Sequence, residues 1–147
     1  MTRIDPRMPP PRRLIPPGIL ETLSDALVTE TQLINELTAV MVRQRAAVET
    51  DDLQRVDDSI FAVHRLLLTL GEARKRRRSV NVLLGQDAEL AVQQLDDALG
   101  AQMTSRVRIA REALRTAARR LFAEIAINRR VLRDALAADP ASHMSLL

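Results

Sequence analysis

The chain has 147 residues, 46% hydrophobic but only 1% aromatic, with no cysteine and a formal net charge of +3. This length suits one domain with a core of its own, and because Phe61 and Phe122 are the sole aromatic residues, that core must be aliphatic. The composition excludes disulfides, thiolate metal sites and a cysteine nucleophile. No stretch approaches the roughly 18 apolar residues of a membrane span, and residues 1–18 lack the apolar segment of a secretory signal, so we expect a soluble, cytoplasmic protein.

The positive charge belongs to the first 18 residues. They contain four arginines and one aspartate, so their net charge equals that of the whole chain, and the rest is neutral. Within that neutral part, residues 19–73 are mainly acidic and residues 105–138 mainly basic. The two regions can pair inside the molecule, which argues against a polyanionic partner.

The prolines divide the chain. Six of the seven lie in residues 1–17 and the seventh is Pro140, so nothing between them interrupts a helix by removing an amide. We therefore predict a disordered Pro/Arg-rich arm at 1–18, a single helical-bundle domain at 19–138 and a flexible tail at 139–147.

Two long helices come first in this domain. Residues 19–49 carry an apolar stripe with alternating steps of three and four, interrupted at Glu30 and Gln44. A short break, ETDD, follows, in which Asp51 is the expected N-cap of a second helix over 52–84. The second helix has the same kind of stripe. Two amphipathic helices joined by a short polar break predict an antiparallel hairpin.

The stripe of the second helix runs into a basic cluster. Five consecutive residues there are basic, and they are Arg74, Lys75, Arg76, Arg77 and Arg78. Five residues at 100° each go right round a helix, so some of them point toward the core, where an unpaired guanidinium is costly. The run either projects beyond the bundle or lies against acidic side chains such as those of Asp87, Glu89, Asp96 and Asp97. A contact with phosphate or an acidic partner is the alternative, and the balanced charge favours the solvated or internally paired reading.

The remaining elements are a shorter helix at about 87–99 and a last long helix at about 105–138. Gly85 is the expected C-cap before the shorter helix. The last helix has one apolar and one arginine-rich face, and Asn128 on its apolar line is typical of a polar residue that fixes register. The predicted fold class is all-α, an elongated antiparallel bundle with three long helices and one shorter helix.

The pattern resembles a known family. Residues 33–84, from LINELTAVMV to RRRSVNVLL, and residues 123–137, AEIAINRRVLRDALA, are similar to the FlgN-type flagellar type III export chaperones. The matching positions are Arg45 at the end of the first arm, Asp51 or Asp52 at the turn, Arg74, and Asn128 with Arg129.

The resemblance implies a cytoplasmic chaperone without cofactor or small-molecule substrate. It would bind the C-terminal helical segment of hook–filament junction proteins and deliver them to the flagellar type III export apparatus. Separately from the resemblance, we expect a monomer or a weak homodimer. Because the family uses its C-terminal helical region for the client, the candidate partner-binding residues are Leu114, Leu121, Ile125, Asn128, Arg129, Leu132, Arg133 and Leu136. An amphipathic helix with spare apolar surface can independently accept a partner helix, although the same residues would also serve simply to close the bundle.

The sequence does not favour catalysis or metal binding. The two histidines, His64 and His143, are not spaced as metal ligands, and His64 reads as a half-buried packing residue. Adjacent aspartate pairs point to different sides of a helix, and there is no glycine-rich phosphate loop. Two alternatives to the chaperone stay open: a basic helical nucleic-acid-binding protein, which would lack stacking aromatics, and a bundle that only self-associates.

Overall fold

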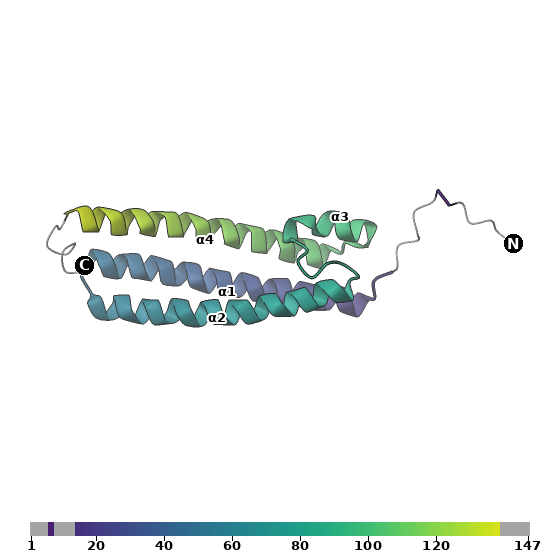
Figure 1. Ribbon diagram of the computed structural model, residues 1–147, viewed down its shortest axis with the longest axis horizontal. Coiled ribbons are helices and arrows are strands. Elements are labelled where there is room, and N and C mark those ends of the chain that lie inside the picture. Colours follow the sequence, from purple (N-terminus) through teal and green to yellow (C-terminus); the bar gives the residue numbers. More distant parts are fainter. Residues whose placement is uncertain (1–5, 8–13, 139–147) are drawn as a thin grey trace.

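Three long helices run side by side along the molecule (Figure 1). They are α1 (Pro17–Glu49), α2 (Leu53–Leu83) and α4 (Ser105–Ala138), and the short α3 (Leu95–Leu99) lies at one end between two 3₁₀ turns, Val92–Gln94 and Gly100–Gln102. The computed structural model describes residues 6–7 and 14–138. The all-α prediction is confirmed for these residues, whereas most of the predicted arm and tail lies outside them.

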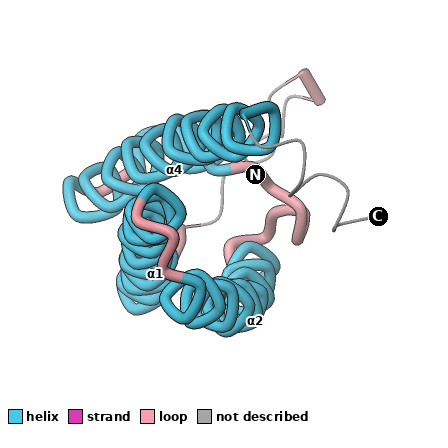
Figure 2. The backbone as a smooth tube through the Cα atoms, turned by 90° about the vertical axis from the view of Figure 1, so that its left-hand side faces the viewer, coloured by secondary structure: helices cyan, strands magenta, loops and turns pink. Residues whose placement is uncertain are grey.

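Helix α1 is the central element. It packs along both α2 and α4, which themselves are not packed along each other, and Figure 2 shows the three helices end on with α1 between the other two. Two contacts show that α4 runs parallel to α1. Arg106 near the start of α4 pairs with Asp25 near the start of α1 at 3.5 Å, and Asn128 near the end of α4 donates a hydrogen bond to the carbonyl of Met41 at 2.8 Å. The hairpin partner α2 is antiparallel to both.

The turn of the hairpin differs from the prediction in its cap. Asp51 adopts a left-handed conformation with φ 53°, and Asp52 is the N-cap of α2, accepting a hydrogen bond from the backbone N–H of Arg55 at 3.2 Å. The prediction of Asp51 as the cap was wrong by one residue. Aspartate is among the few non-glycine residues that tolerate positive φ, so Asp51 can reverse the chain and leave Asp52 to cap the helix.

The segment that leads from α2 back to α4 is largely non-helical. Helix α2 ends in a Schellman motif, in which Gly85 has φ 75° and the amide of Gln86 donates to the carbonyl of Asn81 at 3.0 Å. Gly85 therefore terminates the helix as expected. The shorter helix, expected at 87–99, occupies only Leu95–Leu99, because residues 87–91 form turns held by Asp87, whose carboxylate accepts from the amide of Glu89 at 2.8 Å.

We call the segment between α2 and α4, residues 84–104, the crossing segment. The core is concentrated at the end of the molecule where it lies. There the buried side chains of Leu84, Leu95 and Leu99 pack with residues of α1 and the first half of α4. Other buried members of this cluster are Leu20, Leu23, Leu27, Ile34, Leu70, Val80, Val107, Ala110, Leu114 and Ala117. The crossing segment thus acts as a fourth element over one half of the three-helix frame.

Candidate functional site

Over the other half of the molecule, residues 6–7 and 14–138 provide no such fourth element. Between residues 53 and 69 of α2, Ser59 is the single buried residue, and between residues 118 and 138 of α4 the single buried residue is Asn128. Helix α1, in contrast, has buried residues as far as Ala47. The outer two helices therefore keep apolar surface at this end that the described part of the chain does not cover.

Much of this uncovered apolar surface lies on one side of the molecule. Arg74 of α2 and Ala118 of α4 line one pocket, so the helix sides that bear them are turned toward each other. Steps of seven return to the same side of a helix, which places Leu67, Ile60 and Leu53 in line with Arg74. The same steps place Ile125 and Leu132 in line with Ala118. We call this side the open face and define it by Leu53, Ile60, Leu67, Leu121, Ile125, Leu132 and Leu136.

The residues of the open face are exposed to different degrees. Leu53 is 78% exposed, Leu67 50% and Leu132 44%, which is unusual for leucines on the inward-turned side of a bundle. Leu121 and Ile125 are half-buried. Several exposed leucine and isoleucine side chains on the facing sides of two helices are typical of a site that binds another protein.

A polar cluster joins α1 to α4 beneath this face. Asn128 is buried, its amide donates to the carbonyl of Met41, and its oxygen accepts from Arg45 at 3.3 Å. Arg45 also forms an ion pair with Glu124 at 2.5 Å. These bonds satisfy the buried amide in the way expected of a residue that fixes helix register.

The eight candidate partner-binding residues of the last helix therefore fall into two groups. Leu114 and Asn128 are buried inside the bundle. The others are wholly or partly accessible on α4, and they are Leu121, Ile125, Arg129, Leu132, Arg133 and Leu136. The residues of α2 that share the open face were not among the predicted contacts, although their heptad spacing was visible in the sequence.

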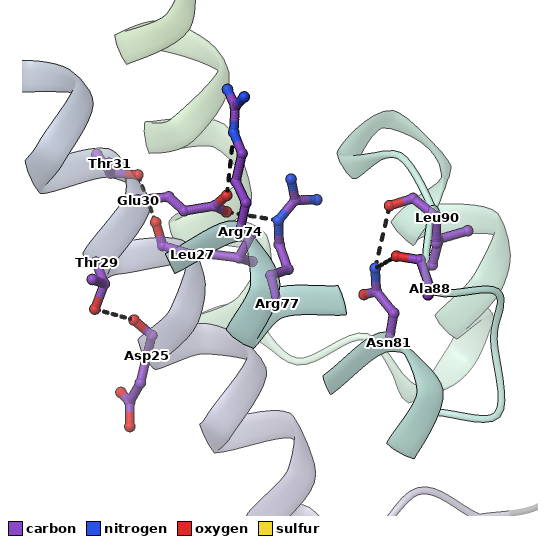
Figure 3. Close-up of polar contacts among 10 residues, drawn as sticks. All are labelled: Asp25, Leu27, Thr29, Glu30, Thr31, Arg74, Arg77, Asn81, Ala88 and Leu90. Carbon is purple, nitrogen blue, oxygen red and sulfur yellow. Dashed lines mark hydrogen bonds and ion pairs between the residues drawn. The ribbon is translucent and has the colours of Figure 1, made fainter. Parts of the chain in front are cut away.

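The arginine run splits around the helix. Arg77 lies 2.7 Å from the carboxylate of Glu30 on α1, and Arg74 reaches the same carboxylate at 4.0 Å (Figure 3). Arg78 pairs with Glu89 of the crossing segment. Lys75 pairs within its own helix with Glu72 at 3.5 Å. The internally paired reading is thus borne out for most of the run, with Glu89 among the expected partners and Glu30 an unexpected one.

Glu30 is the most unusual charged residue of the molecule. Its side chain is 2% exposed, and burial raises its pKa above the ordinary value, an effect that the charges of Arg77 and Arg74 partly oppose. The sequence marked Glu30 only as an interruption of an apolar stripe. The signal that could have identified it was the matching interruption of the second stripe by Arg74 and Arg77.

These residues line a pocket of about 440 Å³ at the inner end of the open face. Its base is formed by Glu30 and Ile34 of α1, its sides by α2 and α4, and its far end by residues 88–93 of the crossing segment. The charged side chains on its wall are four arginines and two glutamates, namely Arg74, Arg77, Arg78, Arg115, Glu30 and Glu89. The pocket is therefore positive overall, and we call it the arginine pocket.

The far end of the arginine pocket is tied directly to α2. The side-chain amide of the buried Asn81 donates to the carbonyl of Ala88 at 3.0 Å and to that of Leu90 at 3.4 Å (Figure 3). Arg111 of α4, also buried, pairs with Asp96 on the other side of the segment. Residues 88–93 are thus held in place from both helices.

A second charged surface lies on the outer side of α4. Arg108, Arg119, Arg130 and Arg133 are exposed, and within the described part of the chain they form no salt bridge. By contrast, Arg106 pairs with Glu21 and Asp25 of α1, so the predicted pairing of the acidic first half with the basic last helix occurs only in part.

The remaining polar candidates of the described residues do not form a catalytic or metal-binding cluster. His64 is exposed, so its predicted half-buried packing role was wrong, and His143 lies outside the described residues. Among residues 6–7 and 14–138, no three histidine, aspartate or glutamate side chains are arranged to hold a metal ion. In the same residues, no helix is both long and apolar enough to cross a bilayer.

Comparisons with known proteins add no relative. No protein-family model, curated protein or solved structure matches this chain.

Proposed function

We propose that this chain is a binding protein whose open face receives an amphipathic helical segment of another protein. The observation that supports this most strongly is the distribution of burial, because the facing sides of α2 and α4 carry leucine and isoleucine side chains that no part of the described chain covers at one end. The crossing segment covers the equivalent position at the other end.

The open face has the dimensions of a short helix. From Leu121 to Leu136 it extends along α4 for roughly 22 Å, at about 1.5 Å per residue, which corresponds to about four helical turns. A fourth helix placed against three existing ones completes the most common form of a helical bundle. Anchors at helical spacing on the ligand would then contact both rows of apolar side chains.

We further propose that the bound segment is the C-terminal helix of a hook–filament junction protein, and that the chain delivers this client to the flagellar type III export apparatus from the cytoplasm. The support is the sequence resemblance to FlgN-type chaperones. Two of the positions that carry it, Arg45 and Asn128, are hydrogen-bonded to each other, and a third, Arg74, lines the arginine pocket next to the open face.

The direct test is calorimetric titration with the C-terminal segments of the hook–filament junction proteins from the same source, at low and at high salt. We expect saturable one-to-one binding that persists at high salt, because apolar burial is not screened. Absence of binding by every segment would contradict the chaperone proposal.

A matched pair of substitutions on α4 locates the site. Leu132 on the open face and Ile127 on the opposite side are 44% and 40% exposed, so an aspartate at either costs the free protein similarly little. We expect Leu132→Asp to weaken binding by about tenfold or more, since a charge would be desolvated in the interface, and Ile127→Asp to leave it unchanged. Equal effects of both would place the client elsewhere.

Nucleic-acid binding is the second candidate, and the exposed arginines on the outer side of α4 favour it. Phosphate binding by these side chains would weaken steeply as salt rises, the opposite of the behaviour expected for the open face. A DNA titration at the same two salt concentrations distinguishes the two. Self-association through the open face, the third candidate, would appear as a dimer in sedimentation without any client.

A further inference from the structure

The arginine pocket lies where a helix on the open face would end. Arg74 continues the row of Leu67, Ile60 and Leu53 on α2, and Leu114 and Ala118 continue the row of α4 into the same pocket. Residues 88–93 stand across its far end, so a docked chain cannot run straight on beyond this point. A segment that terminates here fits the site better than one that must turn outward.

The pocket also has unused hydrogen-bond donors. Arg74 and Arg77 approach Glu30 with their Nε atoms, and Figure 3 shows their terminal nitrogens directed away from that carboxylate. Among the described residues, nothing accepts a hydrogen bond from these terminal nitrogens. Because Glu30 is one carboxylate shared by two guanidinium groups, the cluster retains a positive charge and two donor forks.

We propose that the arginine pocket binds the terminal carboxylate of the docked segment, so that the segment lies on the open face with its C-terminus at Arg74 and Arg77 and its N-terminus toward the hairpin turn. The bound helix then runs parallel to α2 and antiparallel to α1 and α4. This inference rests on the proposed function, and it adds the polarity of the ligand and the chemical group that ends it.

Two physical effects favour this polarity. Guanidinium groups bind carboxylates through charge-assisted, often bidentate hydrogen bonds, which are about twice as strong as neutral ones. The C-terminal end of a helix carries the negative end of its dipole and unpaired carbonyl groups, both of which are stabilised by nearby arginines. The reverse orientation would place the positive end of the dipole and a terminal ammonium group beside four arginines.

The first experiment compares client peptides that end in a free acid with the same peptides amidated. We expect amidation to weaken binding to the full-length wild-type chain by about tenfold, the scale of a hydrogen bond to a charged group. In Arg74→Gln the acid and the amide should bind alike. Arg76→Gln, which removes the same charge from the same run but does not line the pocket, should preserve the tenfold difference.

The second experiment reads the polarity directly by disulfide cross-linking, which is feasible because the chain contains no cysteine. Ala118→Cys lies in the arginine pocket and Leu136→Cys at the opposite end of the open face. A peptide with cysteine in its last turn should cross-link to Ala118→Cys and not to Leu136→Cys, and one with cysteine in its first turn should do the reverse.

The outcomes separate the two proposals. If neither form of the peptide binds, the proposed function fails and this inference with it. If both forms bind equally to the wild type, or if the cross-links show the reversed pattern, the chain is a helix-binding protein but the arginine pocket is not its carboxylate site. If Arg74→Gln and Arg76→Gln reduce the preference equally, the effect is one of general charge and the pocket assignment is overturned.

Discussion

Glu30 and Arg77 form an ion pair that is almost removed from water, since their side chains are 2% and 19% exposed. Such pairs seldom stabilise a fold more than apolar residues of the same volume would, because desolvating two charges costs about as much as their attraction returns. What the pair does here is hold α2 against α1 while it directs two guanidinium groups into one pocket. The Glu30–Arg77 pair therefore matters more for the shape of the arginine pocket than for the stability of the bundle.

The raised pKa of Glu30 predicts how stability depends on pH. Folding favours the protonated form of a carboxyl group whose pKa is raised, so the contribution of Glu30 to the free energy of unfolding is largest below its unfolded pKa and is lost as pH rises through the folded pKa. We expect the free energy of unfolding of the wild type, relative to Glu30→Gln, to increase as pH falls from about 7.5 to about 4.5. Urea denaturation of both proteins at several pH values measures this difference. The contributions of the other carboxyl groups to the pH dependence are common to both proteins and cancel in the comparison.

The opposite trend would also be informative. If the difference shrank as pH fell, the pKa of Glu30 would be lowered in the folded protein, and the attraction of Arg77 and Arg74 would outweigh burial. The arginine pocket would then be more nearly neutralised by Glu30 than its geometry indicates.

At the scale of single residues, the sequence predicted that arginines of α2 would need a carboxylate partner, but it did not identify Glu30 as that partner. The stripe of α2 led directly to Arg74 and Arg77, and the cost of burying an unpaired guanidinium required a carboxylate nearby. The partner expected from the sequence lay in the following segment, and Glu89 does pair with Arg78. Glu30 could not be assigned in advance, because its pairing depends on the register of α1 against α2, which the hairpin turn sets through the conformation of Asp51.

At the scale of elements, Gly71 within α2 and Gly85 just beyond its end give a matched test of the helix and its termination. Gly71 lies within the helix, exposed, and an added Cβ would meet nothing within 4 Å, whereas Gly85 has φ 75° at the helix terminus. We expect Gly71→Ala to raise the free energy of unfolding by about 0.5–1 kcal/mol, through helix propensity. We expect Gly85→Ala to lower it by about 1 kcal/mol, because alanine is strained at positive φ.

Thermal or urea denaturation of the two variants and the wild type shows whether each substitution raises or lowers the free energy of unfolding. Stabilisation by alanine at both positions would mean that the Schellman motif does not terminate α2 in solution. The position at which α2 ends would then not be fixed by Gly85, and residues 88–93 would not be held at the end of the arginine pocket.

The long helices were predictable because their apolar periodicity extends over many turns, and their bounds agree with the sequence-based ranges to within about two residues. The structure of the crossing segment could not be predicted in the same way. The positions Ala88, Ala91, Val92, Leu95 and Leu99 follow helical spacing, but the first three of them pack in turns and 3₁₀ structure that Asn81 holds through side-chain bonds to backbone carbonyls. Periodicity in a short segment does not distinguish a helix from a loop that buries the same apolar side chains.

For the whole molecule, the uneven core implies that stability is uneven too. The end with the crossing segment buries leucines from all the helices, while the other end depends mainly on α1 and on the Asn128 cluster. The open face belongs to this less packed end. Regions that bind partners are commonly those with lower local stability, because their contacts are completed only in the complex.

Amide hydrogen exchange tests this distribution in the free and the client-bound protein. In the free protein we expect residues 53–69 and 121–138 to exchange faster than residues 73–83 and 107–117, because fewer of their apolar neighbours are buried. Saturation with a client segment should slow exchange in the first two regions and change the second two much less, since ligand binding stabilises the states in which the open face is formed. Uniform exchange in the free protein, or protection confined to the outer side of α4 on binding, would show that the uncovered leucines are not the functional surface.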